Sequence, residues 1–147
     1  MKIFLANDHA AIEIKDQVIK FLESLNMEVL NLGTDSSDSV HYPEYASLLA
    51  KEVAKTGERG ILICGSGIGV SMVANKYQGV RAALCKSVED VKLSRLHNNS
   101  NVLCLGSRSS TISEIRDMIS CWLETEFEGG RHQTRVDMFS QLGTEVK

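Results

Sequence analysis

The clearest potential for chemistry lies in the stretch CGSGIG at residues 64–69, where Cys64 opens a run that contains Gly65, Gly67 and Gly69. Glycine at this density costs backbone entropy, so we expect something to require bare backbone here. Amides between a strand and a helix can bind an anion, and they also favour the thiolate form of a neighbouring cysteine. Cys64 could act as a nucleophile or as a base that removes a proton beside a carbonyl, with the amides holding the enediolate oxygen. A tight packing turn that carries a buried thiol is the alternative.

Two common phosphate-binding motifs do not fit this loop. The dinucleotide fingerprint G-x-G-x-x-G, counted from Gly65, meets Val70 at its sixth position and lacks the acidic residue expected about 20 positions later. The P-loop pattern G-x-x-x-x-G-K-[ST] has no match. An anion cradle here would therefore be of another kind.

Asp8 and His9 follow the first apolar run, and His97 closes a segment of helical character. An Asp-His pair at the end of a strand can bind sugar hydroxyls or move a proton. An aspartate that caps a helix beside a surface histidine explains the same residues. For His97 the alternative is a favourable interaction with the helix dipole.

Arg131 and Arg135 stand four residues apart at the start of the last helical segment, in GGRHQTR. Their side chains share one face of a helix, where their charges repel each other, and a bound phosphate would relieve that repulsion. A solvated basic face is the alternative. Arg108, in the segment GSR, could be a third arm of the same phosphate site.

These residues must be positioned by alternating strands and helices. We predict strands at residues 2–6, 28–32, 61–64, 81–85 and 102–105. Helical periodicity marks apolar faces at 14–25, 45–53 and 112–123, and shorter helices are expected at 70–76 and 87–97. Pro43 fits the first turn of the second helix. A final helix is expected over about 131–144. The pattern predicts one Rossmann-like α/β domain over 1–147, a three-layer sandwich around a five-stranded parallel sheet, with the candidate residues at the carboxyl ends of its strands.

Composition excludes several classes of protein. The 147 residues are 43% hydrophobic and carry a formal net charge of −3, which is typical of a soluble globular domain and argues against a general nucleic-acid binder. No apolar stretch approaches the roughly 20 residues that span a bilayer, and Asp8 interrupts any leader. We therefore expect a cytoplasmic protein in which Cys85, Cys104 and Cys121 are buried free thiols.

Taken in order, these motifs resemble the B-type ribose-5-phosphate isomerases, a family that includes galactose-6-phosphate isomerase subunits. The resemblance runs from Met1 to about Val136, through ANDHAAIEIK, HYPEYA, ICGSGIGVSMVANK, GVRAAL, LSRLHNNSNVL, GSR and EGGRHQTR. It implies a Rossmann-like fold, a homodimer or dimer of dimers with active sites built from both subunits, and the final helix at the dimer interface. The implied reaction interconverts an aldose phosphate and a ketose phosphate without a metal or cofactor, and no nucleic acid or membrane is implied as a partner.

The resemblance also implies roles for single residues. Cys64 matches the base that moves the proton between C2 and C1. One branch of the family uses a glutamate where this chain has Val70, which indicates the cysteine branch. His97 matches the acid/base that opens the furanose ring, with Asp8 on the ring side, and Ser66 matches a hydroxyl that assists proton transfer. The binding positions are the loop residues Gly65, Gly67, Ile68 and Gly69 for the enediolate, Asn98 near the reacting oxygens, Tyr42 lining the site, and His9, Arg108, Arg131 and Arg135 for the phosphate.

The size of the sugar is a separate question. The resemblance implies that galactose-6-phosphate subunits lack the His97-Asn98 and GGRHQTR patterns in combination, so their joint presence favours a five-carbon substrate that must be opened from a furanose. Allose 6-phosphate, galactose 6-phosphate and unphosphorylated rare sugars are the alternatives within the family. A sugar-phosphate-binding module without catalysis is the alternative from another class.

Overall fold

The structure is a computed structural model that describes residues 1–143. Its five strands form one parallel sheet in the order β2-β1-β3-β5-β4. The strands are β1 (Lys2–Asn7), β2 (Glu28–Asn31), β3 (Arg59–Cys64), β4 (Ala82–Leu84) and β5 (Val102–Gly106). The helices are α1 (Ile12–Ser24), α2 (Tyr42–Thr56), α3 (Ile68–Ala74), α4 (Val88–Asn98), α5 (Ile112–Glu124) and α6 (Arg131–Met138), with 3₁₀ turns η1 (His9–Ala11) and η2 (Phe139–Gln141).

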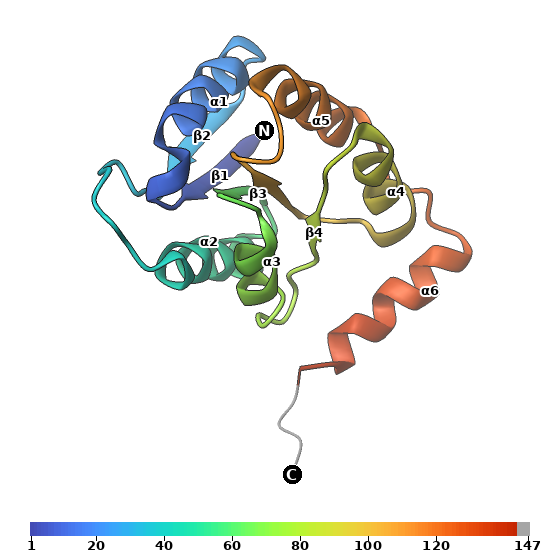
Figure 1. Cartoon of the computed structure of the whole chain (residues 1–147). Coiled ribbons are helices and arrows are strands. Elements are labelled where there is room, and N and C mark those ends of the chain that lie inside the picture. The colour runs from blue at the N-terminus through green and yellow to red at the C-terminus, as the bar shows by residue number, and fades with distance from the viewer. Residues whose placement is uncertain (144–147) are drawn as a thin grey trace.

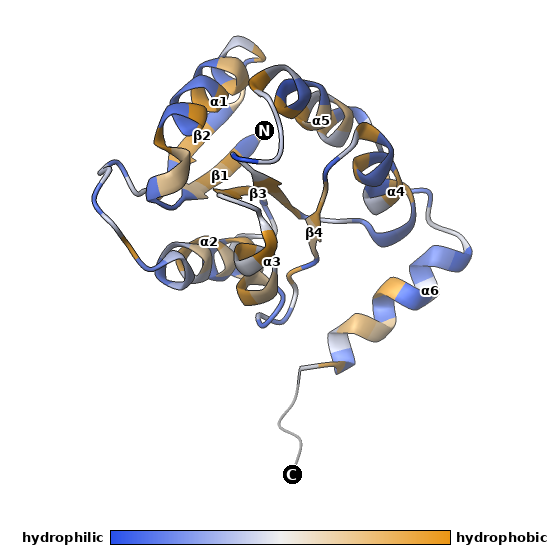
Figure 2. Cartoon of the chain, viewed as in Figure 1, coloured by the Kyte–Doolittle hydropathy of each residue, from blue (hydrophilic) through white to orange (hydrophobic). Residues whose placement is uncertain are grey.

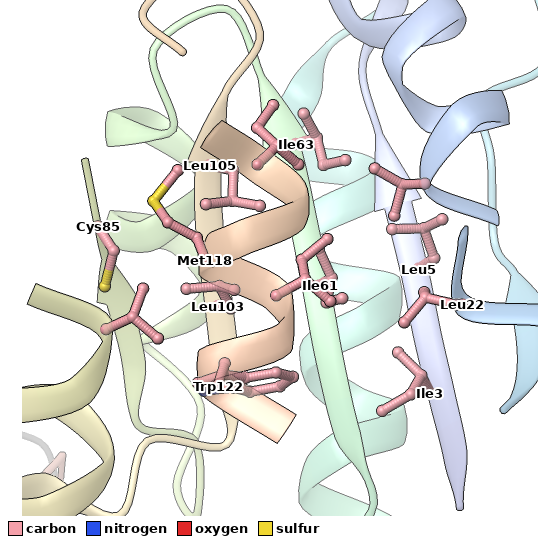
Figure 3. Close-up of a cluster of buried hydrophobic side chains, with 14 of the residues drawn as sticks. Ile3, Leu5, Leu22, Ile61, Ile63, Cys85, Leu103, Leu105, Met118 and Trp122 are labelled. Carbon is pink, nitrogen blue, oxygen red and sulfur yellow. The ribbon is translucent and has the colours of Figure 1, made fainter. Parts of the chain in front are cut away.

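Alternation along the strands divides the core into two clusters, one on each face of the sheet. On one face, Ile3, Leu5, Ile61 and Leu103 pack against α1, α4 and α5, as Figure 3 shows for the side chains around Trp122. On the other face, the next residues along the strands pack against α2 and α3. Figure 1 shows the resulting three layers of helices, sheet and helices. The Rossmann-like sandwich predicted from the sequence is confirmed.

The carboxyl edge of the sheet holds the switch point in strand order. The chain moves from β1 outward to β2 and then crosses back to β3 on the other side of β1. Ligands of open parallel sheets bind where such a reversal leaves a crevice at the carboxyl ends of the strands. Asp8 directly follows β1 and Cys64 ends β3, so these two residues stand on either side of that point.

The last helix lies apart from the sandwich. In Figure 1, α6 projects beyond α4, and Figure 2 shows hydrophobic residues along it although it covers no strand. Val136 is buried, whereas Met138, Phe139 and Leu142 are 62%, 43% and 64% exposed. We infer that the end of α6 and the turn that follows it present an apolar surface to solvent in a single chain.

The expected elements are all present, with shifted bounds. Pro43 stands in the first turn of α2, as predicted. The helix after the glycine loop begins at Ile68 rather than residue 70, and the fourth strand is only three residues long. The final helix ends at Met138 and continues as a 3₁₀ turn to Gln141, and position 144 lies outside the described residues. Within residues 1–143, no helix combines the length and the apolar character needed to cross a bilayer.

Candidate functional site

The loops after β1, β3 and β5 form one hydrogen-bonded surface at the carboxyl edge of the sheet. The Asp8 amide donates to the Ile63 carbonyl at 3.2 Å, and the Ser107 amide donates to the Cys64 carbonyl at 2.8 Å. The Arg108 amide donates to the Gly65 carbonyl at 3.0 Å. These bonds continue the sheet ladders beyond the strands, so the loops that carry Asp8, Cys64 and Arg108 are held in register with one another.

Cys64 lies at the centre of this surface, with only 5% of the residue exposed. Its Sγ accepts a hydrogen bond at 3.1 Å from the amide of Gly67, in a turn that folds the glycine loop back onto the thiol. The amides of Gly65, Ser66 and Gly69 have no hydrogen-bond acceptor among residues 1–143. Unpaired backbone donors beside a sulfur form an environment suited to a negatively charged group.

Packing explains two of the loop glycines. Gly67 has a φ of +79°, and a Cβ atom there would lie 2.7 Å from Leu84 Cδ1 and 3.0 Å from the Leu105 carbonyl carbon. At Gly69 a Cβ atom would lie 2.6 Å from the Cζ atom of Tyr42. The loop is therefore held tightly on its inner side by strands β4 and β5, and Tyr42 covers its outer side.

Arg108 and Tyr42 bring side chains onto the glycine loop from other elements. A Cβ atom at Gly65 would lie 3.3 Å from the Arg108 Nη1 atom, so the guanidinium rests against that residue. Tyr42 begins α2 and is 40% exposed. Both side chains contact the loop that Cys64 opens, and their roles toward a substrate stay predictions.

Asp8 and His9 are tied to neighbouring backbone. The Asp8 side chain accepts a hydrogen bond at 3.0 Å from the amide of Ala10, which caps η1, and the residue is 8% exposed. The structure thus confirms that Asp8 caps a helical turn, which was the alternative interpretation of this residue. The His9 Nδ1 atom accepts a hydrogen bond at 3.1 Å from the amide of Val40, so the other ring nitrogen is available to a ligand.

A buried lysine that the sequence analysis did not single out holds the loop after β2. Lys15 is fully buried on α1, donates to the Thr34 carbonyl at 2.6 Å and pairs with Asp35. The hydrogen bond from Lys15 lowers the pKa of the Asp35 carboxyl. A buried lysine requires an acceptor, and the acceptors Thr34 and Asp35 lie in the polar run TDSSDSVH, which is the sequence feature that could have indicated this contact. This loop also carries Val40 and leads to Tyr42, so Lys15 supports the site at a distance.

His97 and Asn98 lie at the opposite end of the sheet. They close α4, which starts beyond the carboxyl end of β4 and runs back so that its end precedes the start of β5. A helix that follows a parallel strand returns toward the amino edge, whereas Cys64 stands at the carboxyl edge. The prediction that all candidate residues share one edge of the sheet is therefore wrong for a single chain.

Arg131 and Arg135 accompany His97 rather than Cys64. Both are exposed on α6, which packs beside α4 and buries His132 there. The rings of His97 and His132 stack with centroids 4.3 Å apart and an interplanar angle of 17°. Burial lowers the pKa of His132, and the neighbouring His97 adds to this effect. The exposed Glu128 carboxylate lies 3.9 Å from His97 Nε2.

The candidate residues therefore form two groups. The carboxyl-edge group contains Asp8, His9, Tyr42, Cys64, Gly65, Ser66, Gly67, Ile68, Gly69 and Arg108. The α4–α6 group contains His97, Asn98, Arg131 and Arg135. The sequence analysis did not single out His132 and Glu128, although both lie within the EGGRHQTR segment. Spacing along one helix could not show that these residues meet His97, which lies on another helix.

The remaining thiols do not form part of either group. Burial raises the pKa of Cys85 to about 11 and that of Cys104 well above its usual range. Both are buried free thiols, as predicted. Cys121 differs from the prediction because it is only partly buried, on the side of α5 that faces Val88. Of the four cysteines, Cys64 is therefore the one that lies beside the unpaired amides of the glycine loop.

Comparison with known proteins identifies close relatives along almost the whole chain. The model of the Ribose/Galactose Isomerase family matches residues 3–139. Ribose-5-phosphate isomerase B of Escherichia coli is 41% identical over 143 residues, which cover 96% of this chain and 95% of the relative.

Solved structures agree with that result. Ribose-5-phosphate isomerase B from Mycoplasma genitalium, determined with bound ribulose-5-phosphate, superposes with a TM-score of 0.94 at 42% identity, covering 99% of this chain and 97% of that one. The enzyme from Clostridium thermocellum superposes with a TM-score of 0.92 at 41% identity, with 97% of each chain covered.

Proposed function

This chain belongs to the ribose/galactose isomerase family, and from that we propose that it interconverts D-ribose 5-phosphate and D-ribulose 5-phosphate. The observation that carries the proposal is Cys64, a buried thiol that accepts a hydrogen bond from Gly67 inside a loop with unpaired amides. Such a thiol can exchange a carbon-bound proton while the amides stabilise the charge that develops on oxygen. The relative with bound ribulose-5-phosphate supports the choice of a five-carbon sugar.

Isomerisation begins with the opening of the furanose ring. We propose that His97 donates a proton to the ring oxygen while Asp8, on the ring side, accepts the proton of the anomeric hydroxyl. The Glu128 carboxylate lies 3.9 Å from His97 Nε2, on the linking segment before α6.

The Cys64 thiolate then removes the proton from C2 of the open aldose, and the electron pair moves into the carbonyl to form an enediolate. The same thiol returns the proton to C1, which gives the ketose. Ser66 moves a proton between the two oxygens, and Asn98 binds near them. The unpaired amides of the loop 65–69, those of Gly65, Ser66 and Gly69, stabilise the negative oxygen. This sequence of steps needs neither a metal nor a cofactor.

The phosphate completes binding. His9 and Arg108 reach it from the carboxyl-edge group, and Arg131 and Arg135 reach it from the α4–α6 group. The two arginines on α6 lie on one helical face, where a phosphate offsets their mutual repulsion. Tyr42, next to Gly69, lines the site.

These roles require residues from two copies of the chain. His97 and Cys64 lie at opposite ends of one sheet, so a site that contains both is complete only when the α4–α6 group of a second copy meets the carboxyl-edge group of the first. We propose a homodimer with two such sites, which can pair further into a dimer of dimers. Closed two-fold assembly makes both sites equivalent.

Exposed apolar residues support this assembly. Leu48 is 49% exposed on α2, and Ile68 and Met72 are 47% and 67% exposed on α3, the helix that begins in the glycine loop. Met138 and Leu142 are exposed near the end of the α6 segment. Large apolar side chains in this number mark a surface that another chain covers. The four free cysteines fit a reducing compartment, and we propose that the enzyme works in the cytoplasm.

The experiment that tests this function is proton NMR of D-ribose 5-phosphate in D₂O with chelator-treated protein. A parallel sample contains D-allose 6-phosphate, and Cys64→Ala serves as the matched variant. We expect ribulose 5-phosphate only with the unmodified protein. Turnover of allose 6-phosphate alone would keep the mechanism and change the substrate. Silence with both sugars would contradict the proposal and favour galactose 6-phosphate with a partner subunit, or a binding module.

A further inference from the structure

Three potential metal ligands meet where α6 packs on α4. His97, Glu128 and His132 each offer a ligand atom, and these atoms lie within 4.8 Å of one another. The amide of Glu128 donates to the Leu96 carbonyl at 3.1 Å, which fixes the backbone of the linking segment against the end of α4. The cluster is therefore held by secondary structure on both sides.

His132 carries the second, independent observation. The residue is only 7% exposed, and its Nε2 atom has no hydrogen-bond partner among the described residues. A buried nitrogen without a partner is uncommon because the lost hydration is not replaced. The ring lies against His97, so an ion bound between these residues would supply the missing interaction.

We propose that His97, Glu128 and His132 form a binding site for a transition-metal ion of the Zn²⁺ class. Two imidazoles and one carboxylate are a donor set that Zn²⁺ accepts, with a fourth position left open. Imidazole nitrogen favours such ions over Mg²⁺ or Ca²⁺, which prefer oxygen. The charges of Arg131 and Arg135 on the same helix oppose any cation, so only an ion that bonds strongly to nitrogen is retained.

Binding requires a small movement of one ring. Ligand atoms around tetrahedral zinc are roughly 3.3–3.5 Å apart, since each bond is about 2.0–2.1 Å. The stacked rings must therefore turn so that both nitrogens face the ion. His97 can do this, because 39% of its side chain is exposed, and the exposed Glu128 side chain can follow it.

The consequence for the reaction rests on the proposed function. A metal-bound His97 can no longer donate a proton to the ring oxygen of ribose 5-phosphate. Ribulose 5-phosphate is acyclic and does not need that step. The ion would thus inhibit the conversion of the ring-closed aldose and spare the conversion of the ketose, and it would not serve as a cofactor.

Binding is measured without reference to activity. The purified homo-oligomer is titrated with Co²⁺ under visible and ultraviolet spectroscopy, and Zn²⁺ affinity is measured against a chromophoric chelator. We expect one ion per chain without a thiolate charge-transfer band, and no displacement by Mg²⁺. His132→Asn and Glu128→Gln should each weaken binding at least as much as the roughly 10–100-fold lost when an outer partner of a ligand is removed. His41→Asn and Glu126→Gln are matched controls and should bind normally.

Glu128→Gln keeps the test decisive if His132→Asn fails to fold, because the Glu128 side chain is 57% exposed. Absence of binding, a thiolate band, or equal affinity in Glu128→Gln and Glu126→Gln would overturn the site.

In the activity measurement, Zn²⁺ should slow ribose 5-phosphate conversion about tenfold or more, as expected for loss of an acid/base group, and leave ribulose 5-phosphate conversion unchanged. Equal inhibition of both sugars would overturn the capture of His97. A protein that binds the ion and turns over neither sugar would keep the site and contradict the proposed function.

Discussion

The two groups of candidate residues differ in how the chain holds them. The carboxyl-edge group is built largely from backbone, with Cys64 buried and Gly67 packed against Leu84 and Leu105. The α4–α6 group consists of side chains on helix surfaces, and Arg131 and Arg135 are exposed. In the proposed mechanism the first group transfers a proton from carbon, which needs fixed geometry, and the second group opens the ring and binds the phosphate. The comparison predicts which changes abolish chemistry and which only weaken binding.

Cys64→Ala should cause the largest loss of activity. We expect a decrease of about 10²–10⁴-fold or more with both ribose 5-phosphate and ribulose 5-phosphate, because the base acts on the open chain in either direction. Ribulose 5-phosphate binding, measured by calorimetry, should change little. Cys121→Ser, a partly exposed thiol outside both groups, is the control. Retention of activity within tenfold would exclude Cys64 as the base.

Mixing two inactive variants tests whether the groups belong to different chains. Cys64→Ala and His97→Asn proteins, combined and allowed to exchange subunits, form hybrids in which one site carries both changes and the other carries none. For a two-fold dimer with random exchange, about a quarter of the unmodified activity on ribose 5-phosphate should return. No recovery, despite hybrids seen by native mass spectrometry, would place both groups in one chain.

His97→Asn should separate the two steps of the reaction. We expect roughly a 10–100-fold loss with ribose 5-phosphate and a loss of less than about threefold with ribulose 5-phosphate, since only the aldose needs ring opening by a general acid. Initial rates in both directions measure the difference. An equal loss with both sugars would assign His97 to the proton transfer itself.

Gly67→Ala tests how tightly the carboxyl-edge group is packed. Gly79 has a similar positive φ of +86°, and a Cβ atom placed there would meet no other atom within 4 Å. Gly79→Ala therefore reports the cost of the backbone conformation alone, about 1–2 kcal/mol. Gly67→Ala should cost about 1–3 kcal/mol more in the free energy of unfolding, because its Cβ atom meets Leu84 and Leu105. Urea unfolding of both variants measures the difference. An equal loss of unfolding free energy in both would show that Leu84 and Leu105 move to accommodate the added methyl group.

Arg135→Ala should have the smallest effect on chemistry. Loss of one charged hydrogen bond to the phosphate should raise KM about tenfold with little change in kcat. Arg116→Ala, on the exposed side of α5, is the control. An unchanged KM would remove Arg135 from the phosphate site.

The fold could be predicted because each element carries its own periodic pattern, as the alternation of Ile3 and Leu5 with Phe4 and Ala6 in β1 illustrates. The placement of Cys64 was predicted equally well, since it depends on the end of one strand. The placement of His97 was not, although the rule that a helix returns to the amino edge was available. The position of α6 could not be predicted either, because this helix follows no strand, and Phe139 and Leu142 remain exposed because nothing within the described chain covers them.

The projection of α6 from the sandwich also bears on how the enzyme responds to its own concentration. If each site draws His97 and the two arginines from a second copy, a dissociated chain has no complete active site and is inactive. Specific activity should then fall on dilution below the dimer dissociation constant, and substrate that bridges the two copies should oppose that fall. The amount of enzyme in a cell would set the activity of each molecule as well as the number of molecules.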